Sequence, residues 1–235
     1  MNLKAIALGF LALTAVHAHA YQAREVAGIK LGVAVAPQRT AIMKANPSYR
    51  ITEVRDYNGQ VIGVRGVAGK GKQVVDHLLV LHTDRGLVWF VGREQQLPES
   101  GRIVVDTFVS SVKAKFGEPS SSVNILKWYL DRGGKRLSGG LGNSLCVPDR
   151  RHNSRSDLGQ IDELGLNVPA KFGSGCGLMA ESRYVESPTK GLISAFSVQV
   201  ADVALQYDAL TARQNQADAE RKKVIDAARA NKPSL

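Results

Sequence analysis

Long apolar runs are almost missing from this sequence of 235 residues. After the first 20 residues no apolar run approaches 18 residues, so the rest of the chain is not expected to cross a membrane as a helix. The first 20 residues combine a positive charge at Lys4, an apolar stretch over 5–16, and small residues at Ala18 and Ala20. This pattern predicts a cleavable signal peptide, whereas a retained membrane anchor would need about 20 apolar residues. We expect cleavage between Ala20 and Tyr21, and a mature protein that is periplasmic or secreted and not integral to the membrane.

Cysteine is also scarce, with Cys146 and Cys176 as the only two. They do not form a Cys-x-x-Cys motif, and no histidine lies at metal-ligand spacing from either, which argues against a redox pair or a metal site. Two cysteines in an oxidising compartment predict one disulfide bond. The bond would close a loop of about 31 residues and contribute roughly 3–4 kcal/mol on the chain-entropy model. We expect no metal and no cofactor.

The sequence has fewer acidic than basic residues, so the chain carries a net positive charge. Lys and Arg number 31 against 21 Asp and Glu, a formal net charge of +10, and loss of Lys4 with the signal peptide leaves +9. A basic protein is drawn toward anionic partners such as lipid phosphates, acidic glycans or acidic proteins. Nucleic acid is not an expected partner, because an exported protein rarely meets it.

The first half of the mature sequence predicts a short helix followed by a four-stranded antiparallel meander. The helix is expected over 37–46, because Pro37 suits a first turn and Pro47 ends the segment. Alternating apolar and polar residues predict strands, with turn signals at Asn58-Gly59 and over 83–86. The expected strands cover 49–55, 60–67, 73–82 and 87–92.

The second half repeats the order of a helix followed by strands. Apolar residues recur at helical spacing over 103–116 and predict a buried stripe, with Gly117 as the C-terminal cap. The stripe consists of Val104, Val105, Phe108, Val112 and Phe116. Strands are then expected over 126–131, 137–147, 176–185 and 192–200, and Trp89, Trp128 and Tyr129 are expected to pack in the core or on a sheet face.

The C-terminal segment predicts a long helix that begins after Asp202, as its N-cap, and runs to about Asn231. A thin apolar stripe recurs every seven residues, at Val203, Leu210, Ala217 and Val224. The last half of the segment is mostly charged. We therefore expect the first two turns to dock on the body and the rest to project into solvent or meet a partner.

These elements predict an α+β fold, with an antiparallel sheet built from two helix-plus-strands units and a long C-terminal helix. The expected organisation is a signal peptide (1–20), an α+β domain (21–200) and a C-terminal helix with its tail (201–235). The domain is expected to have two unequal halves, about 26–97 and 101–200.

Two short phrases resemble those of exported bacterial proteins. Gly28-Ile29-x-Leu31-Gly32 leads into a short helix, and Lys115-Phe116-Gly117-Glu118-Pro119-Ser120 precedes a strand that bears Trp128. The phrases are similar to those of proteins of the β-lactamase-inhibitor-protein type and of small lipoproteins of the outer-membrane assembly machinery. The resemblance implies repeated helix-plus-hairpin units and protein binding without chemistry, and it assigns no binding residue.

The segment 66–73 fits the phosphate-loop pattern G-x-x-x-x-G-K up to its last position, where Gln73 replaces the Ser or Thr that holds Mg²⁺. The residues that follow predict a strand, whereas phosphate binding needs the start of a helix. We therefore expect a flexible basic loop between strands. Its Lys70 and Lys72, with amides freed by glycine, are candidate residues for weak anion binding.

The histidines and carboxylates do not form an evident catalytic or metal-binding set. Asp76, His77, His82 and Asp84 are neighbours in sequence, but residues 77 and 82 are an odd number apart and would point to opposite faces of a strand. No G-x-S-x-G elbow and no carboxylate pair of a glycosidase stands out. His152 is the one histidine in a plausible functional loop, so a catalytic site assembled around it in space stays an alternative.

The basic loop over 150–155 is the strongest candidate for a binding site. It contains Arg150, Arg151, His152 and Arg155, and it lies inside the loop that the predicted disulfide would close. Arginine forks suit carboxylate and phosphate partners. An ordinary solvated loop is the alternative.

From the sequence we expect a non-enzymatic periplasmic binding or inhibitor-type protein that acts on another cell-envelope protein. The contact would use a sheet face, the basic loop or the terminal helix. The alternatives are an envelope hydrolase with a site near His152 and a basic binder of anionic lipid or glycan.

Overall fold

A single large antiparallel sheet organises the protein. The computed structural model describes residues 24–70, 73–122, 125–146, 166, 168–169 and 172–229. The sheet has eight strands in the order β3-β4-β5-β6-β10-β9-β8, with β7 paired to β10, and all of its strand pairs are antiparallel. The expected α+β fold is therefore confirmed. Within the described residues, no helix is long and apolar enough to cross a membrane.

The helices and strands follow one another along the chain in two halves. Those of the first half are β1 (Glu25–Val26), β2 (Ile29–Lys30), α2 (Gln38–Ala45), β3 (Arg50–Arg55), β4 (Val61–Lys70), β5 (Gln73–His82) and β6 (Val88–Gln96). Those of the second half are a short 3-10 helix (Glu99–Gly101), β7 (Ile103–Val104), α3 (Val105–Phe116), β8 (Leu126–Asp131), α4 (Gly139–Leu145), β9 (Cys176–Glu186), β10 (Leu192–Asp202) and α6 (Val203–Arg229).

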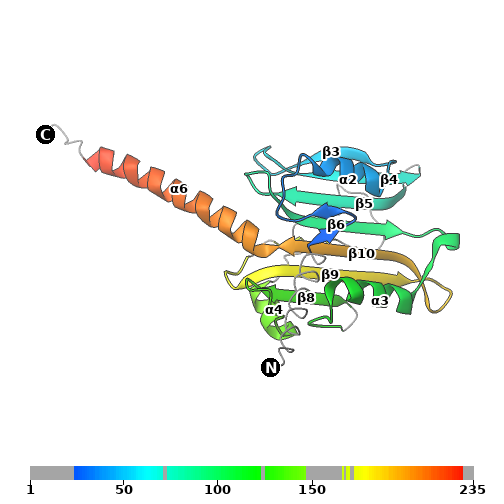
Figure 1. The fold of residues 1–235 in the computed structure, drawn as a ribbon. Coiled ribbons are helices and arrows are strands. Elements are labelled where there is room, and N and C mark those ends of the chain that lie inside the picture. The colour runs from blue at the N-terminus through cyan, green and yellow to red at the C-terminus, as the bar shows by residue number, and fades with distance from the viewer. Residues whose placement is uncertain are drawn as a thin grey trace, which may run out of the picture.

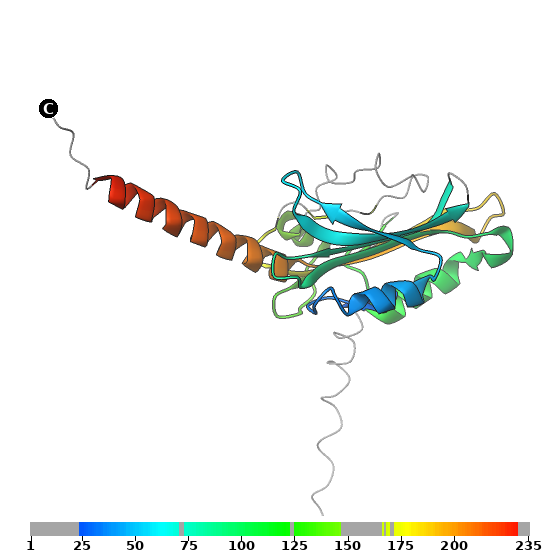
Figure 2. The same cartoon turned by 90° about the horizontal axis from the view of Figure 1, so that it is seen from above.

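Helices cover the two faces of the sheet unequally. Figure 2 shows α2 and α3 on one face and α4 on the other, while α6 leaves the end of β10 and points away from the body, as Figure 1 also shows. The face under α2 and α3 buries a large apolar cluster that includes Ile42, Leu78, Phe108, Trp128 and Val200. The opposite face buries a second cluster that includes Leu81, Phe90, Tyr129, Met179 and the disulfide-bonded cysteines.

Most local predictions are confirmed, because they depend on short-range signals. The Asn58-Gly59 turn joins β3 to β4, with Gly59 at φ +80°, a conformation that glycine adopts without strain. Gly117 caps α3 at φ +78°, and its N–H donates to the carbonyl of Lys113. Asp202 caps α6, since its Oδ1 accepts from the N–H of Leu205 at 3.0 Å. Trp89, Trp128 and Tyr129 are all buried.

Two expectations about the second half are wrong. Val104 is half exposed and lies in β7, where it pairs with Leu192, because α3 begins one residue later than the predicted stripe. The expected strand over 137–147 is instead helix α4. Its Gly142 lies directly on the ring of Tyr129, and Asn143 Oδ1 accepts from the Tyr129 hydroxyl at 2.7 Å, so packing on the sheet outweighs the low helix propensity of glycine.

The predicted disulfide is confirmed. Cys146 and Cys176 are bonded, with their Cα atoms 5.5 Å apart, and both side chains are fully buried. The bond ties the C-terminal end of α4 to the first residue of β9.

Two glycines of α4 provide a matched test of this packing. A Cβ at Gly142 would lie 2.1 Å from a ring carbon of Tyr129, whereas a Cβ at Gly140 would meet nothing within 4 Å. We expect Gly142→Ala to lower the free energy of unfolding by about 1–3 kcal/mol through overpacking. Gly140→Ala should instead raise it by about 0.5–1 kcal/mol through helix propensity. Urea unfolding of both variants checks this, and equal effects would mean that α4 does not rest on Tyr129.

Candidate binding surface at the helix end of the sheet

Three segments that are far apart in sequence meet at the end of the sheet from which α6 leaves. They are the turn between β3 and β4, the turn between β5 and β6, and the first turns of α6. Between them lies a pocket of about 100 Å³. It is lined by Gln60, Ile62, Leu81, His82, Thr83, Asp84, Trp89, Gln206, Ala209, Leu210 and Arg213. No short pattern in the sequence predicts this pocket, because its walls come together through strand pairing.

The root of α6 is firmly held on the body. Arg24 forms an ion pair with the N-cap residue Asp202, and Val203 is fully buried. Arg132 donates two hydrogen bonds to the Asp208 carboxylate, at 3.0 and 2.8 Å, and lies over the ring of Tyr207. The hydrogen bonds from Arg132 lower the pKa of Asp208 below its ordinary value. The direction in which α6 leaves the body is thus fixed by several independent contacts.

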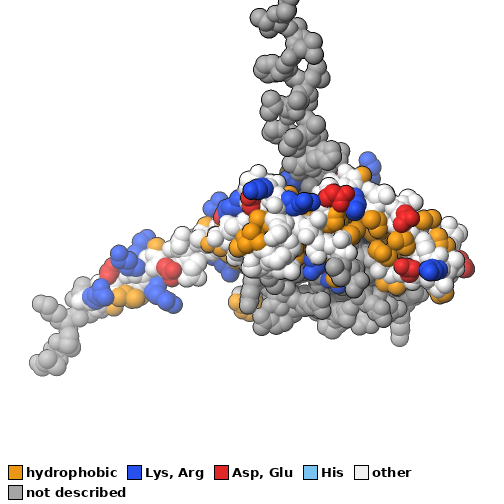
Figure 3. Space-filling view, turned by 90° about the horizontal axis from the view of Figure 1, so that it is seen from below, with side chains coloured by type: hydrophobic (Ala, Val, Ile, Leu, Met, Phe, Trp, Pro, Cys, Tyr) orange, Lys and Arg blue, Asp and Glu red, His pale blue; other side chains and the backbone are white. Residues whose placement is uncertain are grey.

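The rest of α6 has no packing against the body. Every residue from Thr211 to Arg229 is exposed, including Val224 at 69% and Ile225 at 45%. Figure 3 shows Lys and Arg side chains gathered over this distal part, with few hydrophobic ones among them. The expectation that the first two turns dock and the remainder projects is confirmed. At 1.5 Å per residue, the exposed part extends roughly 28 Å.

A second hollow lies along α6, next to the first. Its volume is about 490 Å³ and it is wider and more open to solvent. Phe172, Tyr207, Leu210, Thr211, Arg213, Gln214, Asn215 and Ala217 line it. Leu210 and Arg213 line both hollows, so the two form one continuous surface along the root of the helix.

The β3–β4 turn adds an exposed aromatic side chain at this end of the sheet. Tyr57 is 96% exposed. The turn around it is ordered, because Asp56 Oδ1 accepts from the N–H groups of Asn58 and Gln60, each at 2.9 Å, and Arg55 donates to the carbonyl of Gly59. A large aromatic side chain on an ordered turn is a typical anchor in protein interfaces. A tyrosine beside Asn-Gly in the sequence could have indicated it, since a tight turn cannot bury its central side chains.

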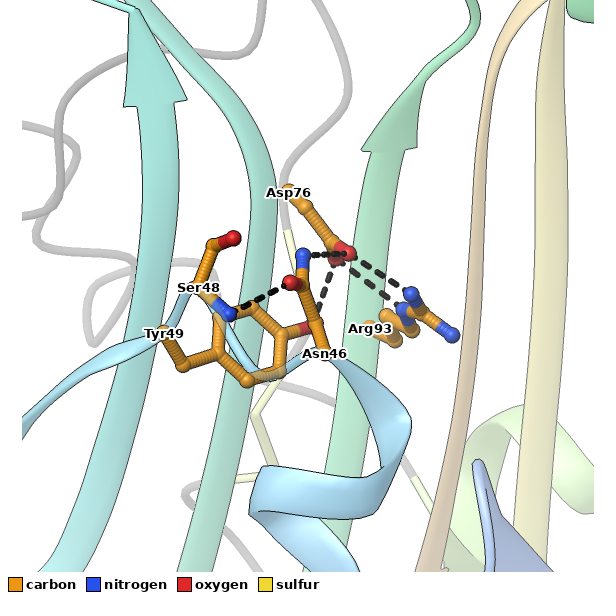
Figure 4. Close-up of polar contacts among 5 residues, drawn as sticks. All are labelled: Asn46, Ser48, Tyr49, Asp76 and Arg93. Carbon is orange, nitrogen blue, oxygen red and sulfur yellow. Dashed lines mark hydrogen bonds and ion pairs between the residues drawn. The ribbon is translucent and has the colours of Figure 1, made fainter.

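A polar cluster centred on Asp76 lies elsewhere and is structural (Figure 4). Asp76 accepts hydrogen bonds from the Tyr49 hydroxyl at 2.6 Å, from Asn46 Nδ2 at 3.0 Å, and from Arg93 Nε and Nη2 at 3.0 and 2.6 Å. Burial, with the hydrogen bond to Asp76 next, raises the pKa of Tyr49 above its ordinary value. The hydrogen bond to Asp76 raises the pKa of Arg93. Because both carboxylate oxygens are occupied by protein donors, this cluster holds the end of α2 to the sheet and leaves no acceptor for a ligand.

A row of buried polar residues crosses the opposite face of the sheet. His77 Nδ1 lies 3.6 Å from Glu94 Oε2, and Ser197 follows Glu94 on the next strand. This order places the carboxylate between the histidine and the hydroxyl. Two strand spacings, about 10 Å, then separate His77 from Ser197, which is too far for the histidine to activate the serine. The row does not assemble the triad of a hydrolase.

The binding residues predicted from sequence are mostly not described. Arg150, Arg151, His152 and Arg155 lie outside the described residues, and so does Lys72. Lys70 ends β4, but its side chain is not described. Of the sequence cluster at 76–84, Asp76 enters the structural network, while His82 and Asp84 line the smaller pocket. Within the described residues no group of three or more side chains could hold a metal ion.

No protein-family model, no curated protein and no solved structure matches this chain. The resemblance to inhibitor-type and outer-membrane assembly proteins therefore stays a prediction.

Proposed function

We propose that this protein is an exported, periplasmic binding or inhibitor-type protein that acts, without chemistry of its own, on another protein of the cell envelope. The binding surface is the helix end of the sheet, made of the exposed part of α6, the two hollows at its root and the turn that carries Tyr57. The described polar clusters support this class. The hydrogen bonds around Asp76 occupy both of its carboxylate oxygens. In the row that contains His77, the carboxylate lies between the histidine and the serine, which is unsuited to catalysis.

The observation that carries the proposal is the exposed part of α6. A helix of this length without tertiary contacts is only marginally stable in water, since most helical stability in proteins comes from packing. Here it is continuous with a root that is fixed by the Asp202 cap and by the Arg132–Asp208 pair. A helical extension that is anchored at its root but itself contributes nothing to the core is suited to present a surface to a partner.

Site-specific photo-crosslinking in intact cells tests this function. A photoreactive residue at Ala219, on the exposed part of α6, should give one discrete covalent adduct with an envelope protein. The same residue at Ser110, on the exposed side of α3, is the matched control and should give none. No adduct from Ala219, or equal adducts from both positions, would contradict the proposal.

Truncation separates binding from folding. A chain that ends after Ala212 keeps the docked turns, and every described residue that it loses is exposed. We expect its midpoint of urea unfolding to match that of the full mature chain, while co-purification of the crosslinked partner is lost. A large loss of stability would instead show that distal α6 belongs to the folded core.

A further inference from the structure

Arg213 has an unusual position among the arginines at this end of the molecule. It lines both hollows at the root of α6 and is exposed to solvent. Nearby Arg24 and Arg132 each pair with a carboxylate, on Asp202 and Asp208. Among the described residues no carboxylate forms an ion pair with Arg213. A guanidinium at the edge of an apolar hollow, with its fork unused, is suited to receive a carboxylate from outside.

The size of the smaller hollow limits what it can hold. Pockets for drug-sized ligands measure about 300–1,000 Å³, and a cavity of roughly 150 Å³ already accommodates benzene. The pocket of about 100 Å³ therefore fits a single apolar side chain rather than a free metabolite. Its apolar wall consists of Ile62, Leu81, Trp89, Ala209 and Leu210.

We propose that the partner contacts this surface through an acidic residue next to an apolar residue. The apolar side chain enters the smaller hollow beside Trp89 and Leu210, and the carboxylate pairs with Arg213. This inference rests on the proposed function and names the chemistry of the partner. Asp84 lies at the same rim and repels a carboxylate, so the acidic residue lies on the side of α6 and the partner segment has one orientation. The larger hollow on that side is lined by no acidic residue.

Selection from a random peptide library against the mature, oxidised protein tests the proposal. We expect enrichment of Asp or Glu within two positions of Leu, Ile or Phe. Arg213→Gln should weaken the best selected peptide at least tenfold, because a hydrogen bond to a charged group is lost. Arg39→Gln removes the same charge from an exposed position on α2, outside this surface, and should leave the affinity within about twofold. Ala209→Leu should block the peptide by filling the hollow.

A charge exchange makes the test specific. The Arg213→Glu variant should not bind the selected peptide. It should bind a version of that peptide in which Lys replaces the acidic residue. Selected peptides without acidic enrichment, or a peptide that binds Arg213→Gln as well as the parent, would overturn the inference. If Ala219 still gives its discrete adduct in that case, the proposed function stands and only the partner chemistry is wrong. If the peptide binds but no adduct forms, the chemistry stands and the envelope role falls.

Discussion

Replacing Asp76 with alanine is expected to lower the free energy of unfolding by about 3–5 kcal/mol. The carboxylate is 2% exposed and accepts from three side chains at once, those of Asn46, Tyr49 and Arg93. Its removal leaves the Arg93 guanidinium, which is 19% exposed, without a counter-charge, and leaves two further donors without an acceptor. Urea unfolding of the protein and of the variant measures the loss. A cost below about 1 kcal/mol would mean that water replaces the carboxylate without difficulty.

Two control variants show where this energy comes from. Tyr49→Phe removes one donor and leaves the charge pair, so it should cost only about 1 kcal/mol. The double variant Asp76→Leu with Arg93→Met replaces the buried pair by apolar groups and should cost much less than Asp76→Ala alone. A double variant that is as unstable as Asp76→Ala would place the loss in packing or in the unpaired donors of Asn46 and Tyr49, and not in the unpaired charge.

The same network gives a dependence on pH. The pKa of Tyr49 is raised above its unfolded value of 10.0, mainly by burial and then by the hydrogen bond to Asp76. The folded state therefore keeps this proton where the unfolded chain loses it, and stability present below pH 10 falls as the pH rises above that value. Tyr49→Phe should reduce the slope without abolishing it, because burial also raises the pKa of Tyr129 to about 12.

The elements of this fold were predictable where the signal is local. Asn58-Gly59 sets a hairpin, Gly117 ends α3, and Asp202 starts α6, and each acts through the backbone within a few residues. Helix α4 was not predictable, because its Gly-rich sequence has low helix propensity and forms a helix only where Gly142 meets Tyr129. The pairing of β6 with β10 could not be predicted either, since it joins strands about a hundred residues apart and no short pattern specifies it.

The candidate site shows the same division. The projecting helix could be predicted from its thin apolar stripe and charged second half, and an exposed Tyr57 was in principle readable from its turn. The hollows at the root of α6 could not be predicted, because Ile62, Trp89 and Leu210 come from three elements that only the sheet order brings together. The basic loop and Lys72 drew attention in the sequence, but they lie outside the described residues and stay predictions.

Removing the disulfide is expected to lower the free energy of unfolding by about 3 kcal/mol. Cys146 and Cys176 are 30 residues apart, so the bond removes much of the conformational freedom of the unfolded chain, and both sulfurs are fully buried. The double variant Cys146→Ala with Cys176→Ala avoids a free thiol and a buried hydroxyl. Urea unfolding with and without dithiothreitol measures the effect.

The reductant is the internal control for this prediction. The native protein should lose stability in dithiothreitol and approach the double variant, while the double variant should not respond at all. The bond links the end of α4 to the first residue of β9, so its loss also frees the helix that rests on Tyr129. Gly142→Ala should therefore lower the free energy of unfolding less in the reduced protein than in the oxidised one. Strictly additive effects would show that the disulfide and the α4 contact act independently. A stable reduced protein would remove the need for an oxidising compartment, on which the proposed envelope function depends.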